Sequence, residues 1–501
     1  MIITKKGKQE LPCKGVMVMH LTFGILLFFL YTVPVQSQPA PLVVLSESSL
    51  KDGVLYDAWV EFKDKDIQTE TQRLKVLKNL EKNFNPRALA RRKKKRTFPG
   101  LFDQRDFPLA PRYLEGTAKT GAEIRVKSRW LNGVSILATK KQIREIKNLP
   151  YVKNVIDFYQ HKPRAQLKSP LKPRPKRPYQ AAGFYGRSEV QVSQLGLHKL
   201  HKAGYNGRGI VIAVIDCGFN LSHTALRHPE RSIRVIAQWD FMENDADVTP
   251  RPGMHPTNYN HGTAVLGILA AYAPKQLVGT AYAADYILCN AEDGEYEYYL
   301  EERWYVAALE FAESRGADVA TSSLVLYGGY KQHQLDGKTA VMTIGLNTAI
   351  GNGVICITGS GNFGHDQDPA VAHLSSPGDA KGVICVGAIT REGIIAPFSS
   401  DGPTVDGRRK PEVLALGKAV ATISPGNKDG YTEGSGVSVA GPVMAGAVAC
   451  LLQVHPDWTV EQLRKALFFS GDFYRKHGKP DPLFIHGYGI PDVFLASGLK
   501  E

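Results

Sequence analysis

The sequence predicts an α/β protein with a doubly wound, mostly parallel sheet, preceded by a small α+β unit. From about residue 186, short apolar runs bounded by Gly alternate with helical patterns; these runs are GIVIAVID, ADYILCNA, GVICITGSGN and GVICVGAIT. Strands that are apolar at every position are typical of a parallel sheet whose two faces are covered by helices. Before residue 160, strand and helix patterns that are richer in charge predict the smaller unit.

Composition and charge support two parts with different roles. The chain has 501 residues, 43% hydrophobic and 22% charged, which excludes disordered, collagen-like and coiled-coil classes. Residues 1–200 hold 38 basic and 16 acidic residues, a balance of +22; residues 201–501 hold 24 and 32, a balance of −8. Such asymmetry indicates a basic front part joined to a mildly acidic back part.

The N-terminus predicts an export signal. Four lysines precede an apolar run at about residues 16–33, and the small residues of VQS follow it. This pattern is typical of a cleaved signal peptide, which we place at residues 1–37. The alternative is an uncleaved anchor, because the run is nearly long enough to cross a bilayer. Later stretches are too short for a span, so none is expected after cleavage.

The smaller unit is expected at residues 54–160. Its predicted strands are rich in β-branched and aromatic residues or alternate in polarity, and its predicted helices carry apolar residues at helical spacing. The predicted strands are residues 54–62 and 152–158, with a further strand within residues 125–139, and the predicted helices are residues 68–83 and 140–149.

Two basic runs interrupt the front part. Residues 89–96 read LARRKKKR, and residues 161–180 hold five Pro, seven basic residues and no acid. The second run cannot pack a core, so residues 161–185 are expected to be an exposed linker. We expect both runs to be solvated surface. A nucleic-acid partner is not expected, because no aromatic residues interleave with the charges on a folded platform.

The cysteines predict neither a disulfide framework nor a metal site. Six are present, and five would remain after signal cleavage, each in an apolar stretch typical of a buried free thiol. A disulfide between Cys356 and Cys385 on two strands is a less favoured alternative. The sequence has no CxxC motif and no Cys/His spacing typical of zinc, so no metal ligand is assigned.

Three motifs in the back part carry chemistry. Asp216 ends an apolar strand, where functional groups of open α/β sheets gather. His261, in NHGT, is expected at the N-terminus of a tightly packed helix. Ser438, in GSGVSVAGP, lies on a Gly-flanked turn that begins a helix of small residues, whose N–H groups favour a nearby oxyanion. Each motif alone has an ordinary structural explanation, such as a capping residue or a satisfied core histidine.

Together, these motifs resemble the subtilases, the subtilisin-like serine proteases, in their order Asp, His, Ser and in approximate spacing. Two further segments agree: Asn362, after the strand GVICI, matches the oxyanion-hole asparagine of the family, and Ser323-Leu324 matches its substrate-pairing strand. The resemblance covers residues 186–501. It extends more weakly to residues 54–160, which are similar to the inhibitory propeptides of secreted bacterial subtilases.

The resemblance implies roles for these residues. Ser438 would attack the scissile carbonyl, His261 would act as general base and acid, and Asp216 would orient the imidazole. Asn362 and the Ser438 backbone N–H would bind the oxyanion. The substrate would lie extended as an added strand. The substrate-binding residues implied are Ser323, Leu324, Val325, Gly359, Ser360 and Gly361.

Several positions depart from the family pattern. Val437 stands where Thr usually precedes the nucleophile, which removes a hydroxyl near the oxyanion hole. Val439 replaces the usual Met after it, and Cys217 follows the catalytic Asp where Ser or Thr is common. Val325 replaces a Gly and could crowd the specificity pocket, so no substrate preference is predicted. None of these departures removes a member of the triad.

The sequence therefore predicts a secreted serine endopeptidase, made as a zymogen and self-processed in the 161–185 linker. It is expected to be extracellular or periplasmic and monomeric, and to need no cofactor. Structural calcium ions are common in the family, but no ligands are assigned. Its partners would be protein or peptide substrates and its own propeptide. The alternative is a catalytically impaired pseudoprotease that binds peptides or partners through the same cleft. The order of the motifs excludes a GxSxG hydrolase.

Overall fold

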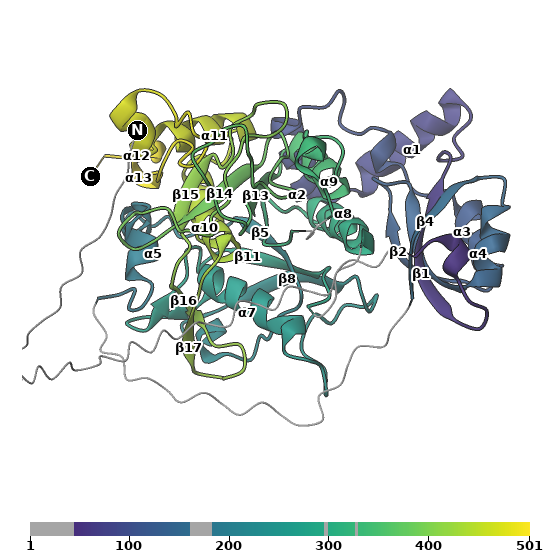
Figure 1. The fold of residues 1–501 in the computed structure, drawn as a ribbon, viewed down its shortest axis with the longest axis horizontal. Coiled ribbons are helices and arrows are strands. Elements are labelled where there is room, and N and C mark those ends of the chain that lie inside the picture. Colours follow the sequence, from purple (N-terminus) through teal and green to yellow (C-terminus); the bar gives the residue numbers. More distant parts are fainter. Residues whose placement is uncertain (1–44, 161–182, 295–298, 326–328, 501) are drawn as a thin grey trace, which may run out of the picture. The chain divides into compact units, whose positions relative to one another are not determined.

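Seven parallel strands form the main sheet of the structure, a computed structural model in which residues 45–160, 183–294, 299–325 and 329–500 are described (Figure 1). The strand order is β15-β14-β13-β12-β5-β11-β8. The strands are β5 (Val211–Asp216), β8 (Arg234–Asp240), β11 (Asp285–Asn290), β12 (Val319–Ser322), β13 (Ile355–Gly359), β14 (Ile384–Ile389) and β15 (Val413–Leu416). The predicted doubly wound α/β fold is confirmed.

Helices cover both faces of this sheet, as the buried apolar runs of its central strands require. In β5, Ile212 and Val214 belong to one core cluster, whereas Val211, Ala213 and Ile215 belong to another. Successive strand residues point to opposite faces, so both faces of β5 are buried. The first face packs on α7 (Thr257–Ala270) and α10 (Val437–Val454), and the second on α8 (Tyr299–Ser314) and α9 (Val341–Gly351).

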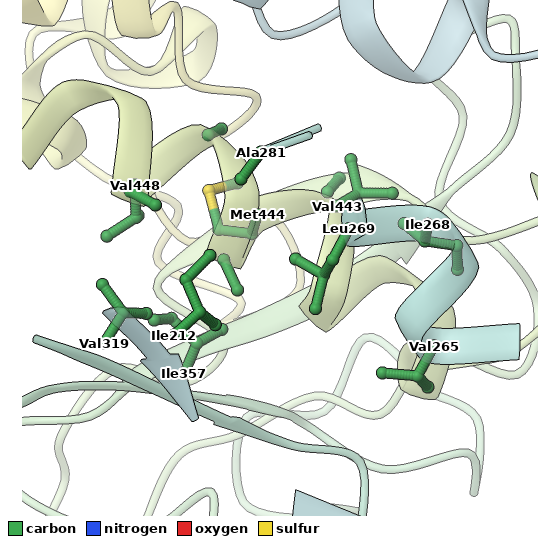
Figure 2. Packing of buried hydrophobic residues seen from close by; sticks show 14 of the residues in the cluster. Ile212, Val265, Ile268, Leu269, Ala281, Val319, Ile357, Val443, Met444 and Val448 are labelled. Atoms are coloured by element: carbon green, nitrogen blue, oxygen red, sulfur yellow. The ribbon is translucent and has the colours of Figure 1, made fainter. Parts of the chain in front are cut away.

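Figure 2 shows the first of these clusters, in which α7 and α10 lie side by side over the sheet. Leu269 of α7 and Val443 and Met444 of α10 lie above Ile212 of β5 and Ile357 of β13. Among the described helices, α10 alone is long and apolar enough to cross a membrane, but 83% of it is buried inside the protein. This helix therefore forms part of the core.

Smaller elements complete this part of the chain. The helices are α5 (Glu189–Ser193), α6 (Leu197–Lys202), α11 (Val460–Phe469), α12 (Asp472–His477) and α13 (Val493–Ser497). The short strands pair in twos: β6 (Arg227–His228) with β7 (Arg231–Ser232), β9 (Tyr272–Ala273) with β10 (Leu277–Val278), and β16 (Val420–Ile423) with β17 (Tyr431–Gly434). Short 3-10 helices span Glu47–Ser49, Gln104–Asp106, Thr224–Leu226 and Gln332–Gln334.

A four-stranded antiparallel sheet, in the order β2-β3-β1-β4, forms the smaller unit. Its strands are β1 (Leu55–Phe62), β2 (Glu123–Ser128), β3 (Gly133–Thr139) and β4 (Val152–Gln160), and its helices are α1 (Glu70–Asn83), α2 (Pro86–Lys95), α3 (Pro111–Ala118) and α4 (Lys140–Lys147). Residues 125–139, where one strand is predicted, hold β3 and most of β2, which form a hairpin. Asn132 supplies the positive φ of 49° and its N–H bonds to the Arg129 carbonyl, which reverses the chain.

The other expectations have mixed outcomes. The predicted helix at residues 68–83 forms, but its apolar side is not buried, and Leu74 is 54% exposed. Five cysteines are buried free thiols, as predicted, so the alternative disulfide between Cys356 and Cys385 is absent. The predicted signal peptide and residues 161–182 of the predicted linker lie outside the described residues.

Candidate active site

Asp216 lies at the point where the order of the main sheet reverses. Strand β5 has β11 on one side and β12 on the other, so the chain winds away from β5 in both directions. Ligands of open α/β sheets bind outside the carboxyl ends of the strands at such a point. Asp216 is the last residue of β5, and its carboxylate is fully buried.

His261 is hydrogen-bonded to this carboxylate. Its Nδ1 lies 2.9 Å from Oδ1 and 3.1 Å from Oδ2 of Asp216, and the imidazole is 25% exposed. Gly262 permits this approach, because a Cβ there would lie 2.3 Å from the Gly218 carbonyl oxygen. The Thr263 hydroxyl accepts a hydrogen bond from Asn220 N–H at 2.7 Å, which fixes α7 to the loop after β5.

The position of His261 within α7 differs from the sequence prediction. The helix begins at Thr257, so His261 lies in its second turn and not at its N-terminus. The preceding segment lacks the apolar periodicity that would have marked this earlier start, since it holds Pro256, Asn258 and Asn260.

Two carboxylates set the charge of the imidazole. Burial opposes protonation of His261, but the charge and hydrogen bond of Asp216 and the charge of Glu292 outweigh it and raise the pKa of His261 to about 9. The imidazolium is therefore favoured over a wider range of pH than in an isolated histidine.

Ser438 is held across the carboxyl ends of two neighbouring strands. Its carbonyl accepts a 2.7 Å hydrogen bond from the hydroxyl of Ser323, the residue after β12. Val437 packs on Gly359, the last residue of β13, where a Cβ would lie 2.4 Å from Val437 Cγ2. Gly436 precedes them with a φ of 148°, a conformation that favours glycine. The turn and Asp216 therefore share one edge of the sheet.

Asn362 is oriented by the same turn. Its Oδ1 accepts a 2.9 Å hydrogen bond from Val437 N–H, which leaves the Nδ2 group of the exposed side chain as a donor. In the part of the chain that the structure describes, no hydrogen bond joins the Ser438 hydroxyl to His261. Catalytic hydrogen bonds often tighten only when substrate binds. Chemically, such an arrangement can supply a nucleophile, a base with an orienting carboxylate, and an oxyanion donor.

The residues expected to bind substrate occupy the ends of β12 and β13. They differ in whether their backbone N–H and C=O groups are already hydrogen-bonded within the protein. Ser360 is fully buried; its N–H donates to the Val386 carbonyl at 3.0 Å, and its carbonyl accepts from Ser375 N–H at 3.0 Å. The Gly361 carbonyl likewise accepts from Ser400 N–H. Leu324 is buried, and Ser323 and Val325 are partly exposed.

Glu292, which sequence reasoning missed, lies beside the dyad. Oxygen atoms of Glu292 and Asp216 and the Cys217 sulfur all lie within 4.8 Å of one another. The available signal was its place just after β11, the strand next to β5, since carboxyl ends of neighbouring strands meet at one edge.

The four-stranded sheet packs against α8 of the main unit. Glu310 accepts hydrogen bonds from the Ser128 hydroxyl and the Trp130 N–H, both at 3.0 Å, and from Arg129 Nε at 2.7 Å. Arg303 donates to Asp157 at 2.7 Å. Trp59, Val126 and Trp130 share a core cluster with α8 and α9; the members from these helices include Trp304 and Leu346.

The basic run at residues 89–96 is also part of this contact, so the expectation of solvated surface is wrong there. It lies in α2, where Arg91, Arg92 and Lys95 occupy one face of the helix and are buried. Arg91 and Arg92 both donate to the Glu313 carboxylate of α8. The Arg92 guanidinium lies 4.6 Å from the ring centre of Phe84. Lys93 and Lys94 stay exposed.

Comparison with known proteins agrees with this arrangement. Residues 207–489 match the profile of the subtilase family, and residues 57–173 match that of the peptidase S8 propeptide domain of Bacteroidota. Subtilisin E of Bacillus subtilis (strain 168) is 27% identical over 386 residues, which are 76% of this chain and 84% of that protein. Subtilisin of Bacillus pumilus is 29% identical over 311 residues, 61% of this chain and 97% of that protein.

Solved structures show the same fold. Fervidolysin from Fervidobacterium pennivorans, a keratinolytic enzyme related to subtilisin, superposes with a TM-score of 0.55 at 20% identity over 92% of this chain and 65% of that one. The MycP3 protease of a type VII (ESX-3) secretion system superposes with a TM-score of 0.51 at 20% identity, over 68% of this chain and 97% of that one. Because the subtilase profile covers more than half of the chain, the protein belongs to the subtilase family and is a subtilisin-like serine peptidase with an N-terminal propeptide domain.

Proposed function

We propose that this peptidase is an endopeptidase that cleaves proteins through Asp216, His261 and Ser438. The hydrogen bond between His261 Nδ1 and Asp216 carries the proposal, because it leaves Nε2 of the ring to take the serine proton. The Ser438 Oγ–H proton passes to Nε2 as Oγ bonds to the scissile carbonyl carbon. The same proton then goes to the leaving amine, and water hydrolyses the acyl-enzyme by the reverse roles.

The oxyanion would be bound by Asn362 Nδ2 and the Ser438 N–H. Asn362 is suited to this role because the hydrogen bond from Val437 N–H to Oδ1 holds the Asn362 amide in one orientation. The Nδ2 donor is therefore preorganised. The peptide substrate would pair as a strand beside residues 323–325, with less contact from Ser360, whose backbone groups are already bonded. No step of this chemistry calls on a cofactor, and we assign no calcium ligands.

The packing of Val437 favours an active enzyme over a pseudoprotease. Its side chain is buried against Gly359 and so stabilises the nucleophile turn, while the oxyanion donors come from other groups. The valine replaces a hydroxyl with apolar packing and leaves His261, Asp216 and Asn362 in their roles.

The propeptide would act as intramolecular inhibitor of an exported zymogen. It contacts α8 through Glu310, Glu313 and the buried tryptophans, which supports a propeptide that stays bound after the chain is cut. Self-processing would cut within residues 161–185, and the mature enzyme would be a monomer outside the cytoplasm without a membrane span. Nucleic acid is not a proposed partner, because Arg91, Arg92 and Lys95 are buried in the protein.

Intact mass measured over time tests this proposal. The purified wild-type chain should shorten to a product that begins near residues 160–186, whereas Ser438→Ala should stay uncut. Ser435→Ala, on the same turn, is the matched control and should shorten like the wild type. Self-shortening of Ser438→Ala, or a mature form that begins before residue 150, would contradict the proposal.

If the wild type folds but stays full length, a second experiment separates an inhibited enzyme from a pseudoprotease. Limited proteolysis that digests the propeptide as well as the linker removes the block of the propeptide, and an assay on unfolded protein follows. Activity that then appears supports an inhibited enzyme, and continued inertness supports the pseudoprotease.

A further inference from the structure

Glu292 is fixed beside the catalytic dyad by the backbone around it. The last residue of β11, Asn290, pairs with Asp216, and Ala291 N–H donates to the Asp216 carbonyl at 3.0 Å. On the other side, Asp293 N–H donates to Glu301 at 2.8 Å, and Gly294 N–H donates to the Asn258 side chain at 3.0 Å. Asn258 belongs to α7, so these bonds hold Glu292 between the end of β5 and the helix that carries His261.

Among the described residues, the carboxylates of Asp216 and Glu292 act on the charge of His261, and the Cys217 thiol lies beside both carboxylates. Asp216 ends β5, Cys217 follows it, and Glu292 comes from the segment after β11. The Cys217 thiol donates to the Thr257 carbonyl at 3.2 Å, and burial raises its pKa, so it is uncharged and a poor metal ligand. The partly buried Glu292 carboxylate is therefore the one charge added to the dyad by these neighbours.

We propose that Glu292 is a positioning residue of the peptidase, a second carboxylate whose charge, beside that of Asp216, stabilises the His261 imidazolium formed during acylation. The inference rests on the proposed triad. Glu292 exchanges no proton in this scheme: the Ser438 proton moves to His261 and then to the leaving amine, while the Glu292 carboxylate favours the intermediate in which the ring is charged.

This role has two opposite effects on rate. A neighbouring carboxylate makes His261 a stronger base, which favours proton transfer, but it also keeps more of the ring protonated at neutral pH. Removal of the Glu292 charge should therefore raise activity at low pH and lower the plateau at high pH. The two pH profiles should cross, which a merely structural defect would not produce.

The test uses the full chain after maturation, with kcat/KM measured from pH 6 to 10 in the presence of EDTA. For Glu292→Gln we expect the midpoint of the acid limb to fall by about one pH unit and the plateau to fall by about three- to tenfold. Glu292→Asp keeps the charge, so the midpoint of its acid limb should lie close to that of the wild type. Glu433→Gln, at an exposed residue of β17 paired with Arg391, removes the same charge and should leave the profile unchanged.

Active-site titration with a fluorophosphonate separates failure of the proposed function from failure of the role of Glu292. If the wild type is not labelled, the proposed function fails; if it is labelled and the acid limb of Glu292→Gln does not move, the role of Glu292 alone is overturned. A rise in KM confined to substrates with Lys or Arg, with the limb unmoved, would instead make Glu292 a substrate contact.

A second measurement is independent of turnover. In Ser438→Ala, NMR titration should show a lower pKa of His261 when Glu292→Gln is added, and an unchanged pKa would overturn the role. If Glu292→Gln does not fold, Glu292→Ala is titrated in the same background, and an unchanged pKa of His261 would overturn the proposal.

Discussion

Arg92 of the propeptide and Glu313 of the peptidase unit form an ion pair in which neither side chain is exposed, with Nε and Oε1 2.8 Å apart. Arg92 also bonds to Asp106 of the propeptide at 2.7 Å, and Arg91 bonds to the same Glu313. A buried pair is costly to break, because removal of one partner leaves the other charge buried without compensation.

The zymogen should therefore depend on Glu313 more than the mature enzyme does. In the uncut Ser438→Ala zymogen, Glu313→Gln should lower the free energy of unfolding by about 3–5 kcal/mol, since the buried Arg91 and Arg92 lose the carboxylate that they share, although Arg92 keeps Asp106. Denaturant unfolding measures this change, with exposed Glu433→Gln as control. A zymogen whose unfolding midpoint does not move would show that the pair does not hold the propeptide in place.

Asn362 should contribute to turnover and little to substrate binding. We expect Asn362→Ala to reduce kcat by about 100- to 1,000-fold with a small change in KM, because the oxyanion is formed only after attack. Steady-state kinetics on a peptide substrate measure both constants. Equal loss in kcat for Asn362→Ala and Phe363→Ala, its exposed neighbour, would argue against a specific donor.

Gly359 should tolerate no side chain while Val437 is present. A Cβ at position 359 would lie 2.4 Å from Val437 Cγ2, so Gly359→Ala should displace the nucleophile turn and lower kcat/KM by at least about tenfold. Val437→Ala removes the obstructing methyl groups, although the Cβ of residue 437, 2.8 Å from the added Cβ, remains. In that background Gly359→Ala should cost less, and additive losses in this double-mutant cycle would refute the contact with the valine methyl groups.

Stability should depend on pH through Glu302. Burial raises the pKa of Glu302 to about 7, although hydrogen bonds from the Tyr330 hydroxyl oppose the shift. A carboxyl whose pKa is higher in the folded state contributes stability that is present below its unfolded pKa and is lost as pH rises through about 7.

Glu302→Gln should remove this dependence. Relative to the Ser438→Ala zymogen, the variant should gain about 3 kcal/mol between pH 4.5 and pH 8, as estimated from the size of the pKa shift. Urea unfolding at both pH values measures the gain. A difference between the two proteins that stays constant with pH would contradict the assignment of Glu302.

The main sheet could be predicted because its physical signal is local. Strands such as β11 and β13 contain runs of buried apolar residues, Tyr286–Cys289 and Ile355–Ile357, and such runs require cover on both faces. The start of α7 was missed because the residues before His261 show no apolar periodicity. The turn of the hairpin at residues 123–139 was missed because Asn132 lies within a run of alternating residues.

Long-range contacts explain the remaining differences. The run LARRKKKR has the composition of a solvated surface, and its burial follows from Glu313 and Asp106, residues that composition does not connect to it. Glu292 was missed for the same reason. Its importance comes from the pairing of β11 with β5, which brings it to Asp216 and which the sequence does not state.

The measurement that tests the central claim most directly is the site of fluorophosphonate labelling in the wild-type protein. After labelling, digestion and mass spectrometry should place the adduct on Ser438, and labelling should slow markedly in Asp216→Asn, whose imidazole loses its orienting carboxylate. An adduct on any other serine, or equal labelling of Ser438→Ala and the wild type, would contradict the account.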